Sequence, residues 1–266
     1  MASQPVAGKL KKFEIKTAFV LVIINENFEK KDLERKGAAA DKANIEKFCR
    51  DAGFAVNAFP SLKKQDGTDL ETIQKTDDLK ADDVKRIFKI ISKASFLQYD
   101  AFICFISSHG SSEGIMGSDR EYIDVNDISR RFNKCNTLTG KPKLFFMQHC
   151  RGDGVDEGIK LKTKKDGGKS DQKFSGLIPT EADILTAYSC VDGYESHRDE
   201  ITGSWFITEL TKVFGAHAVK GMQLTDMLAI VSENVSKLED NGKQVPSYTS
   251  TLTGSVVFKV GDGRNK

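Results

Sequence analysis

The sequence predicts an α/β fold in which a mainly parallel central sheet carries helices on both faces. Three segments, 17–24, 99–107 and 143–150, are dominated by apolar, β-branched and aromatic residues. Such runs are typical of strands that are covered on both faces. Segments whose apolar residues recur at helical spacing separate these runs. This alternation favours parallel strands joined by helices.

The amino-terminal half shows the alternation in order. Residues 17–24 predict the first strand, and residues 39–52 predict an amphipathic helix that Gly53 terminates. Residues 54–56 then predict a short second strand. The next helix opens at Asp82-Asp83, because carboxylates are favourable near a helix N-terminus.

The carboxyl-terminal half continues the pattern with one interruption. Strands are predicted at 99–107, 143–148, 182–189 and 253–260, and helices at 125–132, 204–214 and 223–238. Between residues 154 and 176 the chain is too rich in lysine and glycine to be buried. This stretch predicts a flexible linker rather than a domain.

The amino-acid composition limits the classes of function that the chain can have. The chain has 266 residues, of which 39% are hydrophobic, enough for the core of one large domain or two small ones. Its 40 basic and 38 acidic side chains nearly cancel, so no overall field favours nucleic acid or an anionic membrane. Five cysteines without paired spacing argue against disulfides and indicate a reducing compartment. We therefore expect a soluble, cytoplasmic protein that needs no metal or other cofactor and spans no membrane.

Two of the predicted strands end in residues that carry chemistry. One strand leads into Cys150 and the other into Ser108-His109-Gly110. Because the carboxyl ends of neighbouring parallel strands share one edge of a sheet, Cys150 and His109 are expected within reach of each other. A thiol and an imidazole form a nucleophile with its base, and the amides of Gly110 and Cys150 would bind an oxyanion.

The residues around this pair resemble the caspase family, whose local signature places a histidine upstream of the cysteine. The similarity extends over most of the chain, with the motifs in the family's order and spacing. These are Asn25-x-x-Phe28, Leu33-x-Arg35-x-Gly37, Ser108-His109-Gly110, Gly140 to Phe145, Gln148-x-Cys150-Arg151-Gly152, Ile178-Pro179-x-Glu181-Ala182-Asp183, Ala187-Tyr188-Ser189 and Gly203 to Ile207.

The resemblance implies a cysteine endopeptidase that cleaves after aspartate in apoptosis-type proteolysis, acting on protein substrates. It implies Cys150 as nucleophile and His109 as general acid/base. The matching positions for binding the substrate are Arg35, Gln148 and Arg198 in an acidic-residue pocket, the backbone of Ser196 and Arg198 along the peptide, and Trp205 as an aromatic wall. Guanidinium forks with an amide donor suit a carboxylate.

The family also implies an organisation into segments that fold as one domain. These are a short N-terminal peptide (1–12), a large segment (13–155), a processing linker (156–175) and a small segment (176–266). The short peptide favours an executioner-like zymogen over an initiator. A homodimer, or a heterodimer with a caspase relative, is expected through the C-terminal strand.

Three positions depart from the family pattern. His149 replaces a small residue, so we expect it to displace Cys150, to compete for the thiol proton, or to point away into packing. Glu195 and His197 replace aromatics that line the pocket for the residue before the substrate aspartate. We expect Glu195 to place a carboxylate near the arginines.

The linker offers three candidate cleavage sites, of which Asp166-Gly167 is the best and Asp171 and Asp156 follow. Lysines precede Asp166, where related enzymes often favour acidic or apolar residues, so self-processing is expected to be poor.

Three alternative functions remain open from the sequence. A catalytically impaired decoy would regulate an active relative by dimerisation. A cysteine phosphatase would need an arginine six residues after Cys150, where Asp156 stands. A zinc site would use Cys104, His109, His149 and Cys150, which lack paired short spacing. The linker lacks the interleaved aromatics of a nucleic-acid-binding segment.

Overall fold

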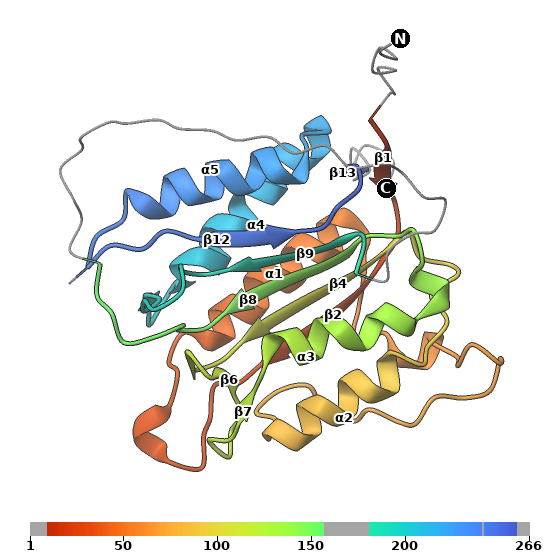
Figure 1. Ribbon diagram of the computed structural model, residues 1–266. Coiled ribbons are helices and arrows are strands. Elements are labelled where there is room, and N and C mark those ends of the chain that lie inside the picture. The colour runs from red at the N-terminus through yellow and green to blue at the C-terminus, as the bar shows by residue number, and fades with distance from the viewer. Residues whose placement is uncertain (1–9, 157–180, 241, 260–266) are drawn as a thin grey trace, which may run out of the picture.

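The computed structural model describes residues 10–156, 181–240 and 242–259. A six-stranded sheet forms its centre, in the order β12-β9-β8-β4-β2-β3 (Figure 1). Its strands are β2 (Ala18–Ile24), β3 (Ala55–Val56), β4 (Ala101–Ser107), β8 (Lys143–Gln148), β9 (Ile184–Tyr188) and β12 (Ser247–Ser250). All neighbours are parallel except β12, which runs antiparallel to β9. The predicted mainly parallel sheet is confirmed.

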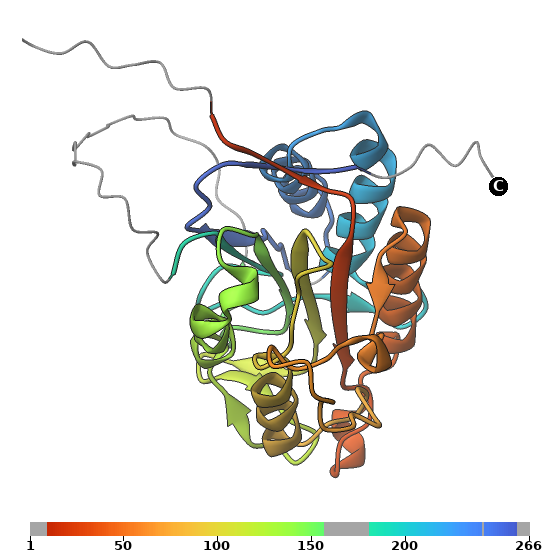
Figure 2. The ribbon, with the colours of Figure 1, turned by 90° about the vertical axis from the view of Figure 1, so that its right-hand side faces the viewer.

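Helices cover both faces of this sheet (Figures 1 and 2). One face carries α1 (Ala38–Ala52), α4 (Trp205–His217) and α5 (Leu224–Ser236), and the other carries α2 (Ala81–Ile91) and α3 (Val125–Arg130). Alternate residues of β2 enter the two cores, Val20 and Val22 on the first face and Phe19 and Leu21 on the second. Burial on both faces explains why the strand sequences show no polar alternation.

Local signals in the sequence set the helix ends. Gly53 terminates α1 in the left-handed conformation, at φ +73°, and its amide bonds to Arg50 and Cys49. Asp82 and Asp83 lie in the first turn of α2 as predicted. The helix predicted at 125–132 is shorter, because α3 ends at Arg130 and continues as a 3-10 turn. The 3-10 turns are Lys31–Leu33, Phe59–Ser61, Arg131–Lys134, Asn136–Leu138 and Ala218–Lys220.

The final strand does not extend the central sheet. β13 (Ser255–Phe258) pairs in parallel with β1 (Lys12–Ile15) in a separate two-stranded sheet. The edge of the central sheet beside β9 is instead β12, whose residues Ser-Tyr-Thr-Ser show no apolar run. The structure thus places β12, and not β13, at this edge of the central sheet, while a dimer contact through the C-terminal strand stays a prediction.

Two small antiparallel sheets lie beside the central one. β5 (Gly110–Ser111), β6 (Gly114–Met116) and β7 (Tyr122–Ile123) follow β4, and β10 (Arg198–Asp199) pairs with β11 (Gly203–Ser204). None of the helices in the described ranges is long and apolar enough to cross a membrane. Most of the predicted linker, with Asp166 and Asp171, lies outside the described residues. The carbonyl of Asp156 accepts from the amide of Lys243 at 2.8 Å.

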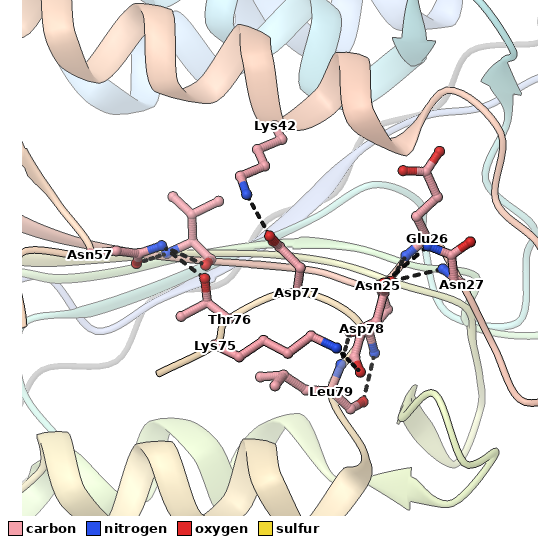
Figure 3. A network of polar contacts seen from close by, with 11 residues as sticks. Asn25, Glu26, Asn27, Lys42, Asn57, Lys75, Thr76, Asp77, Asp78 and Leu79 are labelled. Carbon is pink, nitrogen blue, oxygen red and sulfur yellow. Dashed lines mark hydrogen bonds and ion pairs between the residues drawn. The ribbon is translucent and has the colours of Figure 1, made fainter. Parts of the chain in front are cut away.

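A polar network fixes the carboxyl end of β2 (Figure 3). The Asp78 carboxylate accepts from the amides of Glu26 and Asn27 at 2.9 and 2.8 Å. Burial alone would raise the pKa of Asp78, but these hydrogen bonds outweigh it and the pKa is lowered. The Asn25 side chain exchanges hydrogen bonds with the backbone of Leu79 at 2.8 and 3.2 Å. The segment that follows β2 is thus held in one position.

Candidate active site

The register of β4 and β8 brings the two sequence candidates to one edge of the sheet. Ser107 is paired with Gln148, so His109 and Cys150 each follow the last paired residue of its strand by two positions. The structure therefore places both residues at the carboxyl edge of the sheet.

The backbone defines the tautomer of His109. Its Nε2 lies 2.9 Å from the Leu33 carbonyl oxygen, and because a carbonyl only accepts, Nε2 must carry the proton. The Nδ1 atom is left with a lone pair, as a base requires. The ring also packs on Phe28, with centroids 5.0 Å apart. Burial, followed by the positive charge of Arg35, lowers the pKa of His109 to about 4.

Gly110 offers an amide that its hairpin does not use. The amide of Met116 donates to the His109 carbonyl at 2.9 Å, which makes this a hydrogen-bonded pair of the antiparallel ladder. Pairs alternate, so the next one, Gly110 with Ile115, is non-hydrogen-bonded and the Gly110 amide points away from β6. A side chain here would bring a Cβ to 2.6 Å from the Gly114 oxygen and from His149 Nδ1.

Cys150 is partly buried and lies against the loop after β9. Its sulfur is 3.4 Å from the amide of Ser196 and 3.9 Å from the Ser196 carbonyl oxygen. Within the described ranges the sulfur bonds to Ser196 rather than to His109. The loop is held closely, since a Cβ on Gly152 would lie 2.4 Å from the Gly193 oxygen.

Arg35, Gln148 and Arg198, which we call the arginine cluster, lie around Ser196 and Cys150. Arg35 is only 1% exposed and donates from Nη1 to the Asn25 carbonyl at 2.9 Å. Its Nε has no partner among the described residues. Burial, followed by the charge of Arg198, lowers the pKa of Arg35 to about 10.

The other members of the arginine cluster also keep capacity for a ligand. Gln148 Nε2 donates to Ser196 Oγ at 2.7 Å, while its buried Oε1 has no partner in the described part of the chain. Arg198 Nε donates to the carbonyl of Lys36 at 2.8 Å. Lys36 is the residue that follows Arg35, so this bond brings Arg198 to the backbone next to Arg35. Two guanidinium groups, one with an Nε–H donor on Arg35 that is free among the described residues, suit a carboxylate ligand, whereas the Gln148 Oε1 is an acceptor and would not bind it.

Asp41 supports the arginine cluster from behind and was not identified from the sequence. Its fully buried carboxylate accepts from Ser107 Oγ at 2.8 Å, and from the hydroxyl and amide of Ser204 at 2.7 Å each. Arg35 Nη2 donates to the same Ser107 hydroxyl at 3.0 Å, which links the two charges. One signal was available: Asp41 stands four residues before Ile45, on the apolar face of its helix.

His149 points into packing, one of the three expected outcomes. It is 3% exposed, and its Nδ1 donates to the Cys150 carbonyl at 2.7 Å. Its ring lies against Gly110 and 6.4 Å from the Tyr188 ring. Burial lowers the pKa of His149 to about 4. Its Nε2 keeps the lone pair and has no hydrogen-bond partner among the described residues, so competition for the thiol proton stays a prediction.

Glu195, His197 and Trp205 form what we call the outer wall. The His197 ring stacks on Trp205, with centroids 4.7 Å apart and planes at 22°. Glu195 is half-buried, and its amide donates to the Gly154 carbonyl at 3.0 Å. The carboxylates that act most strongly on Arg198 are those of Asp41, Glu200 and Glu26. The expectation that Glu195 places a carboxylate near the arginines stays a prediction.

The geometry argues against the zinc alternative. Cys104 is fully buried in the core beneath α2 and α3, away from the edge that carries Cys150. In the described ranges, no group of three histidine, cysteine, aspartate or glutamate residues could hold a metal ion.

Comparison with known proteins agrees with this arrangement. The family model of the caspase domain matches residues 17–257. The chain is 31% identical over 245 residues to caspase-6 of Gallus gallus, covering 85% of this chain and 74% of that protein. It is 32% identical over 260 residues to caspase-3 of Xenopus laevis, and the match covers 88% of this chain and 89% of that protein.

A solved structure is similar over nearly the whole length. The crystal structure of caspase-1 from Spodoptera frugiperda matches with a TM-score of 0.77 and 27% identity, covering 97% of this chain and 98% of that one. The phosphatase alternative finds no support in these relationships. From its sequence, its fold and the residues at the carboxyl edge of its sheet, the chain belongs to the caspase family of cysteine peptidases.

Proposed function

We propose that this protein is a cysteine endopeptidase that cleaves peptide bonds after aspartate. The observation that carries the proposal is the arginine cluster: two guanidinium groups withdrawn from water, with the Arg35 Nε donor unpartnered among the described residues. Both guanidinium groups interact electrostatically with Cys150. A substrate carboxylate bound there would place the following carbonyl near the nucleophile.

The chemistry follows from these positions. The Cys150 sulfur attacks the carbonyl carbon while His109 Nδ1 takes up the thiol proton, and the Gly110 and Cys150 amides bind the oxyanion. Collapse of this intermediate breaks the C–N bond, and His109 returns the proton to the leaving amine. Water, deprotonated by His109, then hydrolyses the thioester and restores the thiol.

The finer features of this function are also proposals. We infer protein substrates in apoptosis-type proteolysis, a zymogen cut in the linker at Asp166, Asp171 or Asp156, and a cytoplasmic location. We place the contact with a second copy or a caspase relative at β12, because an unpaired sheet edge can extend its ladder.

One observation favours the alternative of a decoy that regulates an active relative. The Ser196 amide, expected along the substrate peptide, is hydrogen-bonded to the Cys150 sulfur at 3.4 Å. A peptide must displace this contact before it can bind. A decoy would retain it.

The test is hydrolysis by protein deliberately cut in the linker. We expect slow but measurable cleavage of peptides that contain aspartate, followed by mass spectrometry of the products. Cys150→Ala should abolish it, and replacing the peptide's aspartate with asparagine should reduce it to background. Equal background rates for wild type and Cys150→Ala would contradict catalysis and favour the decoy.

A further inference from the structure

A second cationic site lies at the opposite edge of the sheet from Cys150. Its cavity has a volume of about 590 Å³. The lining residues are Lys64, Gln65, Asp66, Ser92, Lys93, Arg130, Arg131 and Lys134, which we call the lysine-rich cavity. Lys93 follows α2 and precedes β4, and Lys134 precedes β8, so the cavity lies near the amino ends of these strands. It shares no residue with the candidate active site.

The charges around this cavity are strongly unbalanced. Five cationic side chains line it against one carboxylate, Asp66. That carboxylate accepts from the Thr68 amide at 2.9 Å and from its hydroxyl at 2.7 Å. Arg130 has one loose ion pair, with Glu181 at 3.9 Å. Within the described residues the other four cations, Lys64, Lys93, Arg131 and Lys134, have no ion-pair partner.

Backbone contacts hold the three segments of the cavity together. The Gln65 amide donates to the Lys93 carbonyl at 3.2 Å, and the Ser95 amide donates to Lys63 at 2.7 Å. Cys135 Sγ lies 3.7 Å from the Ala94 carbonyl, which ties the third segment to the second. Three segments that are far apart in the sequence therefore place their cationic side chains around the same cavity. Like charges gathered in this way create a positive potential that attracts an anion.

We propose that the lysine-rich cavity binds a compact anion that carries three or more phosphate groups. Arginine donates to phosphate in pairs, and lysine adds point charges. The cavity is open to solvent, so a ligand would be held at the surface chiefly by charge. The lining contains no aromatic ring on which bases could stack, which disfavours single-stranded nucleic acid. Inorganic tripolyphosphate and a nucleoside triphosphate share the required chemistry.

The experiment uses the full chain and sodium tripolyphosphate at near-physiological salt. We expect saturable binding of one anion per chain by calorimetry, with a rise in Tm because the ligand binds only the folded state. Arg131→Glu with Lys134→Glu should weaken binding at least ~tenfold, because charge-assisted hydrogen bonds become repulsive contacts. Both residues are exposed, so folding should be retained.

The matched control is Lys31→Glu with Lys220→Glu, which changes the net charge equally at exposed sites outside the cavity, Lys31 following β2 at the carboxyl edge of the sheet. This control should leave the affinity within about twofold, since distant exposed charges are screened. ATP serves as a parallel probe: equal affinity identifies the triphosphate as the ligand, and tighter binding identifies a nucleotide. Absence of saturable binding, or equal losses in both double variants, would overturn the proposal.

Discussion

The arginine cluster and the outer wall lie at the same edge of the sheet but are held differently. Arg35 and Gln148 are buried, and the cluster is tied through Ser107 to the buried carboxylate of Asp41. Glu195 and His197 are half-buried on a loop, where the His197 ring stacks on Trp205 and the His197 amide donates to Gln244 Oε1 at 2.6 Å. A buried charged network tolerates few changes, because each loss leaves a charge unpaired. A loop-borne wall can change at little cost.

Asp41→Asn should produce the largest effect, because it removes the buried charge behind the arginine cluster. We expect the free energy of unfolding to fall by about 3–5 kcal/mol in urea denaturation. In linker-cut protein, KM for aspartyl peptides should rise more than kcat falls. Asp226→Asn is the matched control, since Asp226 also lies in the first turn of a helix but is exposed. If Asp41→Asn and Asp226→Asn had the same free energy of unfolding, the arginine cluster would not depend on a buried charge, and its contrast with the outer wall would be lost.

His149→Ala tests a substitution that lies inside the site rather than on the wall. The pKa of His149 is about 4 in the folded protein and about 6.5 when unfolded, so only the unfolded state takes up a proton between these values. Wild-type stability should therefore fall as the pH drops from 6.5 to 4, with His149 contributing up to ~3 kcal/mol of that loss. In His149→Ala, the free energy of unfolding should fall less steeply over the same pH range, because this contribution is absent. Unfolding curves at several pH values measure it, and parallel profiles would contradict a buried neutral imidazole.

Glu195→Tyr probes the outer wall directly. We expect about a tenfold gain in kcat/KM on peptides with an apolar residue before the aspartate, because an apolar surface replaces a carboxylate. Stability should hardly change, since Glu195 is half-buried and its bond to Gly154 uses only the backbone. Glu121→Tyr, at an exposed position outside the outer wall and the arginine cluster, should leave these rates unaltered. A large loss of stability in Glu195→Tyr would mean that wall and cluster are equally constrained.

The pH dependence of catalysis should show the smallest effect. Burial and the positive charges of Arg35 and Arg198 hold the pKa of His109 at about 4 in the free protein. The acid limb of kcat/KM reports the free protein and should lie near that value. A bound substrate carboxylate offsets the arginine charges, so the acid limb of kcat should lie at higher pH, by about 0.5 unit. If the acid limbs of kcat and kcat/KM fell at the same pH, the charges of the arginine cluster would not influence the pKa of His109.

Most of the fold was predictable from local patterns. The runs before Asn25, Ser108 and Cys150 became the buried strands β2, β4 and β8. β12 was missed because it is a polar edge strand, recognisable only from its partner β9. The pairing of β13 with β1 was missed because it joins the two ends of the chain.

The candidate site was predictable in its composition but not in its arrangement. Strand ends and motifs identified Cys150 and His109. Nothing local indicated that Leu33 would orient His109 from 76 residues away, or that Asp41 would accept from Ser107 and Ser204. The orientation of His149 was likewise open, since a histidine in that position is compatible with three outcomes.

The sequence by itself determined the buried strands, the main helices, the family and the strand ends that carry Cys150 and His109, because each depends on periodicity or on residues that are neighbours in the chain. Only the tertiary structure decided the tautomer of His109, the burial of His149, the support of Arg35 by Asp41 and the gathering of cations at the lysine-rich cavity. These depend on contacts between residues far apart in sequence. The energies of these interactions depend on how deeply the groups are buried and on the distances between them, and a local sequence pattern specifies neither.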